Sequence, residues 1–242
     1  MGLTHSDPQI VNALYDNDKI QDRVFSFYIN NSTQSSFIDI GALKSSNIKG
    51  GTNALRYIEA NPVDYFWSGF NQGVSFGATP NATNSFKYGS FADFTSDVLE
   101  DESAYTIFDT SLPYIAIANQ HFDSFLAKLF EQVGGYDYNI TDGVDVLTNG
   151  ILMTRCSYEF PTIQFLFNDV WLQMNKEDYF YDSSEAQDGS VCMLRIMANS
   201  ENFNIFGTPL MQGYYVVFDA DNHRIGFGPS SNSDKPTPVT GS

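Results

Sequence analysis

Basic residues are scarce in this chain of 242 residues. It contains 12 Lys and Arg against 29 Asp and Glu, which gives a formal net charge of −17. Such a surface repels phosphate groups, so we expect neither nucleic acid nor an anionic membrane as a partner. The charge suits a merely soluble surface. It equally suits acidic surroundings, where protonation of carboxylates lowers self-repulsion.

Long apolar runs are also lacking. No stretch approaches the length that a membrane span requires. Residues 1–5 show no basic segment followed by an apolar core, which is the pattern of a signal peptide. We therefore expect either an intracellular protein or a sequence that starts downstream of the true beginning.

Side chains for metal, phosphate or thiol chemistry are few. His5, His121 and His223 lie apart without metal-ligand spacing, and no glycine-rich phosphate loop follows a strand pattern. Cys156 and Cys192 have no nearby His, so a cysteine nucleophile is not expected. Two cysteines fit one disulfide without showing it. We expect no metal and no cofactor.

Aromatic residues, by contrast, are abundant. The chain has 21 Phe and 14 Tyr, many in short alternating runs that are typical of β-strands. Turn signals occur at Asn168-Asp169 and at 220–223. The strand patterns fall at residues 24–29, 36–41, 55–58, 73–77, around 86–91, 105–108, 163–167, 170–172, 191–194, 214–218 and 225–227. The pattern predicts a mostly β protein, with the first two strands paired as a hairpin.

Two helices interrupt the β pattern. Asp7-Pro8 is a capping signal before apolar residues at helical spacing. Asn119 is a second possible cap, and Gly134-Gly135 ends the apolar stripe that follows it. That stripe contains Phe122, Phe125, Leu126, Leu129, Phe130 and Val133. We expect it to face the core.

Four Asn-x-Ser/Thr sequences occur in polar stretches, at Asn30, Asn31, Asn81 and Asn139. They are compatible with glycosylation in a secretory compartment.

The stretch Tyr105–Ile115 places a carboxylate directly after an apolar strand pattern. Asp109 follows Phe108 and precedes Thr110 and Ser111. A carboxylate at the tip of a core strand is costly unless it is hydrogen-bonded or functional. The same residues also fit a simple turn in which the Asp side chain caps its own backbone. Both interpretations stay open at this point.

The order of the segments resembles the pepsin-like aspartic proteases. The motifs that carry the resemblance are Asn204-Ile205-Phe206-Gly207, the strand Tyr214–Phe218, Ile225-Gly226-Phe227 with Pro229, the segment from Cys156 through Pro161-Thr162-Ile163 to Cys192, and Met1-Gly2-Leu3 with Phe25–Tyr28. The resemblance covers nearly the whole chain up to Pro229. It implies an all-β, pepsin-like C-terminal lobe with a few short helices and part of the interlobe sheet.

The resemblance also implies boundaries and a compartment. Residues 1–30 resemble the end of an N-terminal lobe and an interlobe strand, residues 31–229 resemble the C-terminal lobe, and we expect 230–242 to be a disordered tail. Cys156 and Cys192 would form that lobe's disulfide. A secretory, lysosomal, vacuolar or extracellular location follows from the family.

In this family Asp109 would be one half of a catalytic pair of carboxylates. Thr110 and Ser111 would orient it, and Ile107, Leu112 and Phe66 would line the substrate cleft. Two carboxylates a few ångströms apart share one proton, so that one activates a water and the other protonates the scissile group, as aspartic proteases exemplify. No second strand-Asp-Thr/Ser-Gly pattern occurs in the chain. The partner carboxylate would come from a missing N-terminal lobe or a second chain.

The catalytic turn departs from the family pattern at two positions. Ser111 stands where the family has Gly, and Leu112 stands where many members have Ser or Thr. The hydroxyl that Leu112 lacks would donate to the carboxylate, a bond of about 1.5–3 kcal/mol.

These departures leave several functions open. The first is an aspartic endopeptidase in truncated or single-lobe form, acting on peptide or protein substrates, with Asp109 from two copies meeting as a variant of it. The second is a catalytically inactive peptide-binding or structural relative. The third is a secreted glycan-binding protein. Only the aromatic content and the possible glycosylation sites support it.

Overall fold

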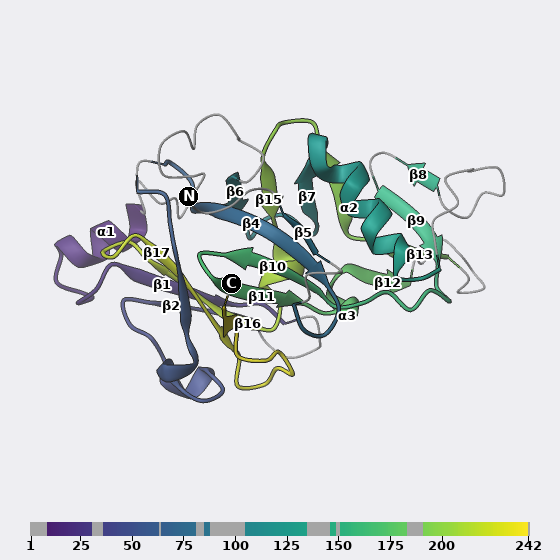
Figure 1. Cartoon of the computed structure of the whole chain (residues 1–242). Coiled ribbons are helices and arrows are strands. Elements are labelled where there is room, and N and C mark those ends of the chain that lie inside the picture. Colours follow the sequence, from purple (N-terminus) through teal and green to yellow (C-terminus); the bar gives the residue numbers. More distant parts are fainter. Residues whose placement is uncertain are drawn as a thin grey trace. The chain divides into compact units, whose positions relative to one another are not determined.

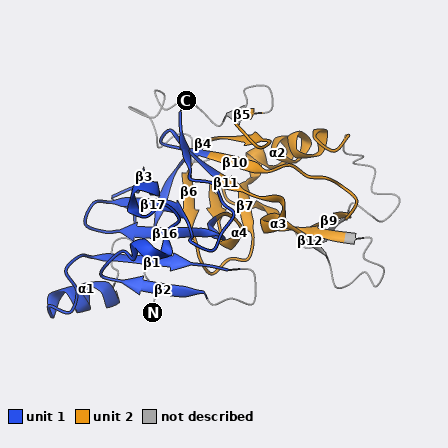
Figure 2. Cartoon of the chain, turned by 90° about the horizontal axis from the view of Figure 1, so that it is seen from below, with its two compact units in different colours: residues 1–70, 166–172, 211–242 blue, residues 71–165, 173–210 orange. Residues whose placement is uncertain are grey.

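The structure, a computed structural model, describes residues 9–30, 36–62, 64–80, 85–87, 105–134, 146–148, 151–182 and 191–241. The chain divides into two compact units, shown in blue and orange in Figure 2. Unit 1 comprises residues 1–70, 166–172 and 211–242, and unit 2 comprises residues 71–165 and 173–210. These units do not follow the boundaries at residues 30 and 229, so the division into parts of two lobes stays a prediction.

Most elements of the chain are strands (Figure 1), which confirms the predicted all-β class with a few short helices. Unit 1 contains α1 (Gln9–Asp16), β1 (Val24–Tyr28), β2 (Phe37–Ile40), the 3-10 helices η1 (Ser45–Asn47) and η2 (Thr52–Ala54), β3 (Arg56–Glu59), β16 (Tyr214–Asp219), β17 (Arg224–Pro229) and β18 (Val239–Thr240). Unit 2 contains β5 (Ser85–Lys87), β6 (Tyr105–Phe108), β7 (Ile115–Ala118), α2 (Asn119–Glu131), β8 (Val146–Thr148), β9 (Ile151–Arg155), α3 (Lys176–Tyr179), β12 (Phe180–Asp182), β13 (Val191–Leu194), β14 (Ile196–Asn199) and β15 (Asn204–Phe206). The chain passes from one unit to the other within β4 (Ser68–Phe76), β10 (Ile163–Phe167), β11 (Val170–Met174) and α4 (Thr208–Met211).

The main sheet of unit 1 is antiparallel, in the order β2-β1-β16-β17-β3. The predicted hairpin of β1 and β2 is confirmed, with Phe25 opposite Ile40. Side chains alternate between the two faces of a strand. On one face Phe25 stacks on Phe218 at 4.9 Å, and the Trp67 ring packs edge-on against Phe218 at 5.1 Å. Rings paired at such distances stabilise the fold beyond their buried area.

A buried polar network lies on the other face of β1. The Ser26 hydroxyl donates to the Tyr215 oxygen (2.6 Å), and the Tyr215 hydroxyl donates to Asp39 Oδ2 (3.0 Å). The Asn47 amide donates to the same Asp39 oxygen at 3.1 Å, and the Lys44 ammonium pairs with Oδ1. Burial raises the pKa of Tyr215, so its phenol stays protonated and can donate. The network joins β1, β2 and β16 to the segment that follows β2.

The turn between β16 and β17 is tied to the start of β1. Asp221 accepts hydrogen bonds from the backbone N–H of Arg23 (2.9 Å) and from its Nε (2.7 Å). Burial raises the pKa of Asp221, but the hydrogen bonds and positive charge of Arg23 outweigh burial and leave the pKa below its usual value. The predicted turn at 220–223 is confirmed, and His223 adopts a left-handed φ of 48°.

Residues 230–241 correct the prediction of a disordered tail. Ser230 and Lys235 are buried, and β18 pairs antiparallel with β11, with Val239 opposite Trp171. The polar, proline-rich composition suggested disorder, but backbone groups of this segment are hydrogen-bonded within unit 1.

In unit 2, β15 lies between β6 and β7, parallel to the first and antiparallel to the second. β14 continues the sheet beside β7, and α2 contacts both of these strands. The predicted apolar stripe of α2 is confirmed, since its Phe and Leu side chains are buried. Asn119 is not the cap but the first helical residue, because β7 runs directly into α2 and Ala118 occupies the cap position.

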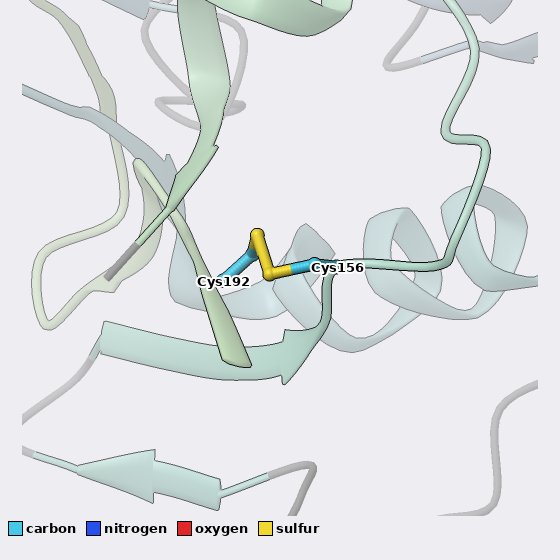
Figure 3. The surroundings of a disulfide bond; sticks show 2 residues. All are labelled: Cys156 and Cys192. Carbon is cyan, nitrogen blue, oxygen red and sulfur yellow. A yellow bond between two sulfur atoms is a disulfide. The ribbon is translucent and has the colours of Figure 1, made fainter. Parts of the chain in front are cut away.

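A smaller sheet of unit 2 has the order β12-β13-β9-β8. The Cys156–Cys192 disulfide is confirmed and joins the chain just after β9 to β13 (Figure 3). It spans a sequence separation of 36 residues. Closing a loop of this size restricts the unfolded chain and so stabilises the folded one.

Several predictions fall outside the described residues. These are the Asp7 cap, the possible glycosylation sites at Asn31, Asn81 and Asn139, and the strand predicted near 86–91 beyond Lys87. Asn30 is described and half-buried. Among the described residues, no helix is both long and apolar enough to cross a membrane.

We expect Asp221→Asn to lower the free energy of unfolding at neutral pH by about 0.2–1 kcal/mol, as for a solvent-screened ion pair. Because the folded pKa is depressed, the stabilisation is present above the unfolded pKa and is lost as the pH falls through the folded pKa. Urea unfolding at neutral pH and well below about pH 3.9 measures this. The variant and the parent should converge in acid. The exposed neighbour substitution Asp22→Asn is the control, and a gap that does not change with pH would contradict the assignment.

We expect the double substitution Cys156→Ser with Cys192→Ser to lower the free energy of unfolding by about 2–5 kcal/mol. The reason is the regained entropy of the unfolded chain, and urea titration followed by circular dichroism measures it. The reduced parent protein serves as the control and should match the double variant. Equal stability of the oxidised parent and the variant would refute the prediction.

Candidate active site

Asp109 lies at the end of a strand that buries alternate side chains. Thr106 and Phe108 on β6 are buried, while Ile107 is half-buried. The backbone N–H of Asp109 donates to the carbonyl oxygen of Phe206 at 3.0 Å, which extends the pairing of β6 with β15 by one residue. The position of Asp109 is therefore set by backbone hydrogen bonds rather than by its side chain.

The carboxylate of Asp109 is held by Ser111. The backbone N–H and the hydroxyl of Ser111 donate to Oδ1 at 2.8 and 2.6 Å. The backbone N–H of Leu112 donates to the Asp109 carbonyl at 3.3 Å and closes the turn. This is the capping turn that the sequence allowed. Both side-chain bonds go to Oδ1, and Oδ2 accepts no hydrogen bond from the described residues.

Gly207 lies directly against this turn. Its backbone N–H donates to the carbonyl oxygen of Tyr114 at 3.2 Å. A Cβ atom at this position would lie 2.3 Å from the carbonyl oxygens of both Leu112 and Tyr114. These oxygens are backbone atoms and cannot turn aside as a flexible side chain would. Only glycine therefore fits here, because its backbone can approach so closely.

Thr208 and Asn204 also support the turn and its strands, and no sequence pattern predicted these roles. The backbone N–H and hydroxyl of Thr208 both donate to the Leu112 carbonyl, at 2.8 and 3.1 Å. The buried Asn204 side chain donates to Thr106 Oγ1 (3.2 Å) and accepts from the Ala118 N–H (2.9 Å). It thereby bridges β6 and β7 across β15. In the sequence, the sign of this role is the polar residue Asn204 at the start of an apolar strand. A buried amide needs hydrogen-bond partners, so such a residue is expected to bond to neighbouring strands.

A chain of aromatic rings underlies the turn within unit 2. Phe206 of β15 packs on Phe165 at 4.6 Å, Phe165 stacks on Phe125 at 6.4 Å, and Phe125 packs on Phe76 at 5.3 Å. All four side chains are buried. β15, which Gly207 directly follows, is thus fixed to the core through α2, and this packing limits its movement.

The structure brings most of the predicted site residues together. Asp109, Thr110, Ser111 and Leu112 form the turn, and Ile107 is two residues upstream of Asp109 on β6. Phe66 belongs to unit 1, where it is 47% exposed and packs against Tyr65 at 5.4 Å. Its place in a substrate cleft stays a prediction, as do the orienting roles of Thr110 and Ser111.

At the Asp109 turn, the described residues offer the chemistry of a single carboxylate. No group of three or more His, Cys, Asp or Glu side chains within the described ranges is arranged to hold a metal ion. A hydrogen-bonded carboxylate can act as a general base toward water or as one member of a proton-sharing pair.

Asp109 thus lies in an Asp-Thr-Ser turn at the end of β6, and this turn packs against Gly207, which directly follows a strand paired with two neighbours. The comparison with known families agrees with this geometry. A family model described as eukaryotic aspartyl protease matches residues 2–230, and the chain belongs to this family.

Relatives with similar sequences include plasmepsins and a penicillopepsin. Plasmepsin I of Plasmodium falciparum (isolate 3D7) is 27% identical over 228 residues, which cover 91% of this chain and 41% of that protein. Plasmepsin IV of the same isolate is 26% identical over 230 residues, covering 93% and 42%. Penicillopepsin-1 of Talaromyces stipitatus is 25% identical over 218 residues, covering 89% and 46%. The chain thus spans less than half the length of these curated relatives.

We expect Gly207→Ala to lower the free energy of unfolding by about 1–3 kcal/mol or more, because the added methyl group overlaps two backbone carbonyl oxygens. The amides of Gly207 and Thr208 should also lose protection against hydrogen exchange, since their partners lie in the displaced turn. Chemical denaturation and exchange measured by mass spectrometry test both effects.

The control is Gly134→Ala, where a Cβ meets no atom within 4 Å and only the positive φ of 96° is strained. It should lower the free energy of unfolding by about 1–2 kcal/mol and leave the amides of the Asp109 turn protected. Unchanged protection at Thr208 in Gly207→Ala would show that the turn tolerates a side chain there.

Proposed function

We propose that this chain contributes one lobe and one catalytic carboxylate to an aspartic-type endopeptidase that hydrolyses peptide bonds. The proposal is supported chiefly by the two hydrogen bonds that Asp109 Oδ1 accepts from Ser111. The carboxylate is thereby oriented at the end of β6 above Gly207. Membership of the aspartyl protease family supports the same chemistry.

In this mechanism Asp109 pairs with a second carboxylate that another lobe or chain supplies. The two groups share one proton, because two adjacent charges cannot both ionise. One carboxylate accepts a proton from the attacking water while the other donates its proton toward the scissile carbonyl. Ser111 occupies Oδ1 and leaves Oδ2 of Asp109 available to water and to the partner group. Thr110 would help to orient the turn.

The proposed substrate is an extended peptide. Extended substrates bind through backbone hydrogen bonds, and pockets for alternate side chains provide specificity. Ile107, Leu112 and Phe66 are the proposed apolar contacts, of which the first two are half-buried in unit 2. The Cys156–Cys192 disulfide supports a location in a secretory, lysosomal, vacuolar or extracellular compartment, because such bonds persist under oxidising conditions.

The alternative is a catalytically inactive peptide-binding or structural relative. Ser111 favours it, because its hydroxyl donates to the carboxylate at 2.6 Å and adds bulk where the family has glycine. Leu112 favours it too, since its side chain offers no hydroxyl to the carboxylate. Both substitutions change the groups that the turn offers to the Asp109 carboxylate.

We expect Asp109→Asn to lower kcat for cleavage of an unfolded protein by about 10²–10⁴-fold at acidic pH, since the general acid-base group is lost. The assay compares the purified chain alone with the chain supplied with an upstream lobe, with and without a pepstatin-type inhibitor. Asp22→Asn, an exposed carboxylate of unit 1, is the control and should retain activity.

Activity that survives Asp109→Asn would remove this residue from the mechanism. Ser111→Gly separates the two candidate functions, because it restores the glycine and keeps the backbone N–H. Full cleavage by both the parent and Ser111→Gly supports the endopeptidase. Cleavage that appears only in Ser111→Gly, or in neither protein even with the upstream lobe, supports the inactive relative.

A further inference from the structure

Residues 231–241, which we call the C-terminal strap, lie beyond the part of the chain that the family model matches. The strap is nevertheless bonded to unit 1 along its length. The Ser231 N–H donates to the Asn47 carbonyl at 2.9 Å, and the Gly241 N–H donates to the Asp169 carbonyl at 3.0 Å. The aspartyl protease family does not explain what this segment does.

The first anchor of the strap is Lys235. Its ammonium lies 4.9 Å from the centroid of the Tyr214 ring, and the residue is only 3% exposed. Lysine is almost never this buried unless its charge is compensated. The negative face of an aromatic ring attracts a cation, and the attraction grows when water is excluded. The sequence places one of its few basic residues at this point.

Gly213 allows the side chains of Ser233 and Lys235 to approach the backbone of unit 1 closely. Gly213 has a φ of +79°, and a Cβ there would lie 2.7 Å from Ser233 Oγ and 2.9 Å from Lys235 Cγ. The side chains of Ser233 and Lys235 therefore lie directly against the backbone of Gly213, whose positive φ favours glycine. Gly213 and Tyr214 together form a socket for the lysine stem.

The second anchor is an edge of β11. β18 is the terminal strand of its sheet and pairs with β11 through Val170 opposite Thr240 and Trp171 opposite Val239. The Trp171 indole N–H also donates to the Gly241 carbonyl at 2.9 Å. A strand edge with unpaired backbone groups is a template for pairing with another chain. β18 covers that template.

We propose that the Gly213–Tyr214 socket and the β11 edge form a binding site for an extended, lysine-containing peptide strand, which the C-terminal strap occupies as a releasable segment. Main-chain pairing at β11 provides affinity, and the lysine socket sets the register. Pro236 and Pro238 restrict the unbound segment to extended conformations, which lowers the entropy lost on docking. Both residues of β18 are exposed, so the buried side chains that hold the strap in place are Lys235 and Pro238.

The test uses the full chain with Lys235→Glu, which places a carboxylate against the Tyr214 ring face. Hydrogen exchange of the Ser231, Lys235 and Gly241 amides should become about tenfold faster or more, as expected when a buried cation–π contact is lost. Amides of β1 and β16 should keep their protection. A fluorescent peptide of residues 231–242 should then bind the opened variant and not the parent, as measured by anisotropy.

Three controls make the result specific. Lys19→Glu makes the same charge change at an exposed position of unit 1 and should leave the strap protected. Lys235→Met keeps the apolar stem and should release the strap less than Lys235→Glu does. The peptide carrying the Lys-to-Glu change should bind neither protein.

Any of three outcomes would overturn the proposal. Continued protection of the strap in Lys235→Glu would show that Lys235 is no anchor. An opened variant that does not bind the parent peptide would show that the edge is no acceptor site. Loss of protection throughout β1 and β16 would show that the strap is an inseparable part of the core.

Discussion

The close approach of Gly207 to the carbonyl oxygens of Leu112 and Tyr114 is the constraint on which the Asp109 turn depends. It allows β15 to lie between β6 and β7, so that the backbone of one strand supports the turn that leaves another. Thr208 and Asn204 add side-chain bonds on either side of the glycine. The position of Asp109 thus results from backbone geometry, and Ser111 donates two hydrogen bonds to its carboxylate.

Much of this arrangement could be predicted from the sequence. The apolar runs identified many of the strands, though not β7, β9 or β14, and the spacing of apolar residues identified α2. The order of the segments identified the family, which the match to the family model then showed. The disulfide followed from the resemblance rather than from the cysteine count. Local patterns were sufficient because propensity, periodicity and turn residues agree along most of the chain.

The errors have a common physical origin. The tail was predicted to be disordered because its composition is polar, but Lys235 is buried against a ring that belongs to β16. Asn119 was predicted as a cap because of its type, but β7 leads straight into the helix. In both cases a partner distant in sequence or a neighbouring element decides the outcome, and a local pattern contains no information about that partner.

The hydrogen bond between Ser26 and Tyr215 joins residues that are 189 positions apart. During synthesis, β1 and β2 leave the ribosome long before β16, their neighbour in the sheet, has been translated. The strands of unit 2, which lie between them in the chain, are complete before unit 1 can close. The edge of β1 that pairs with β16 therefore stays unpaired until β16 has been synthesised. A chaperone would be most useful to the nascent protein in this period.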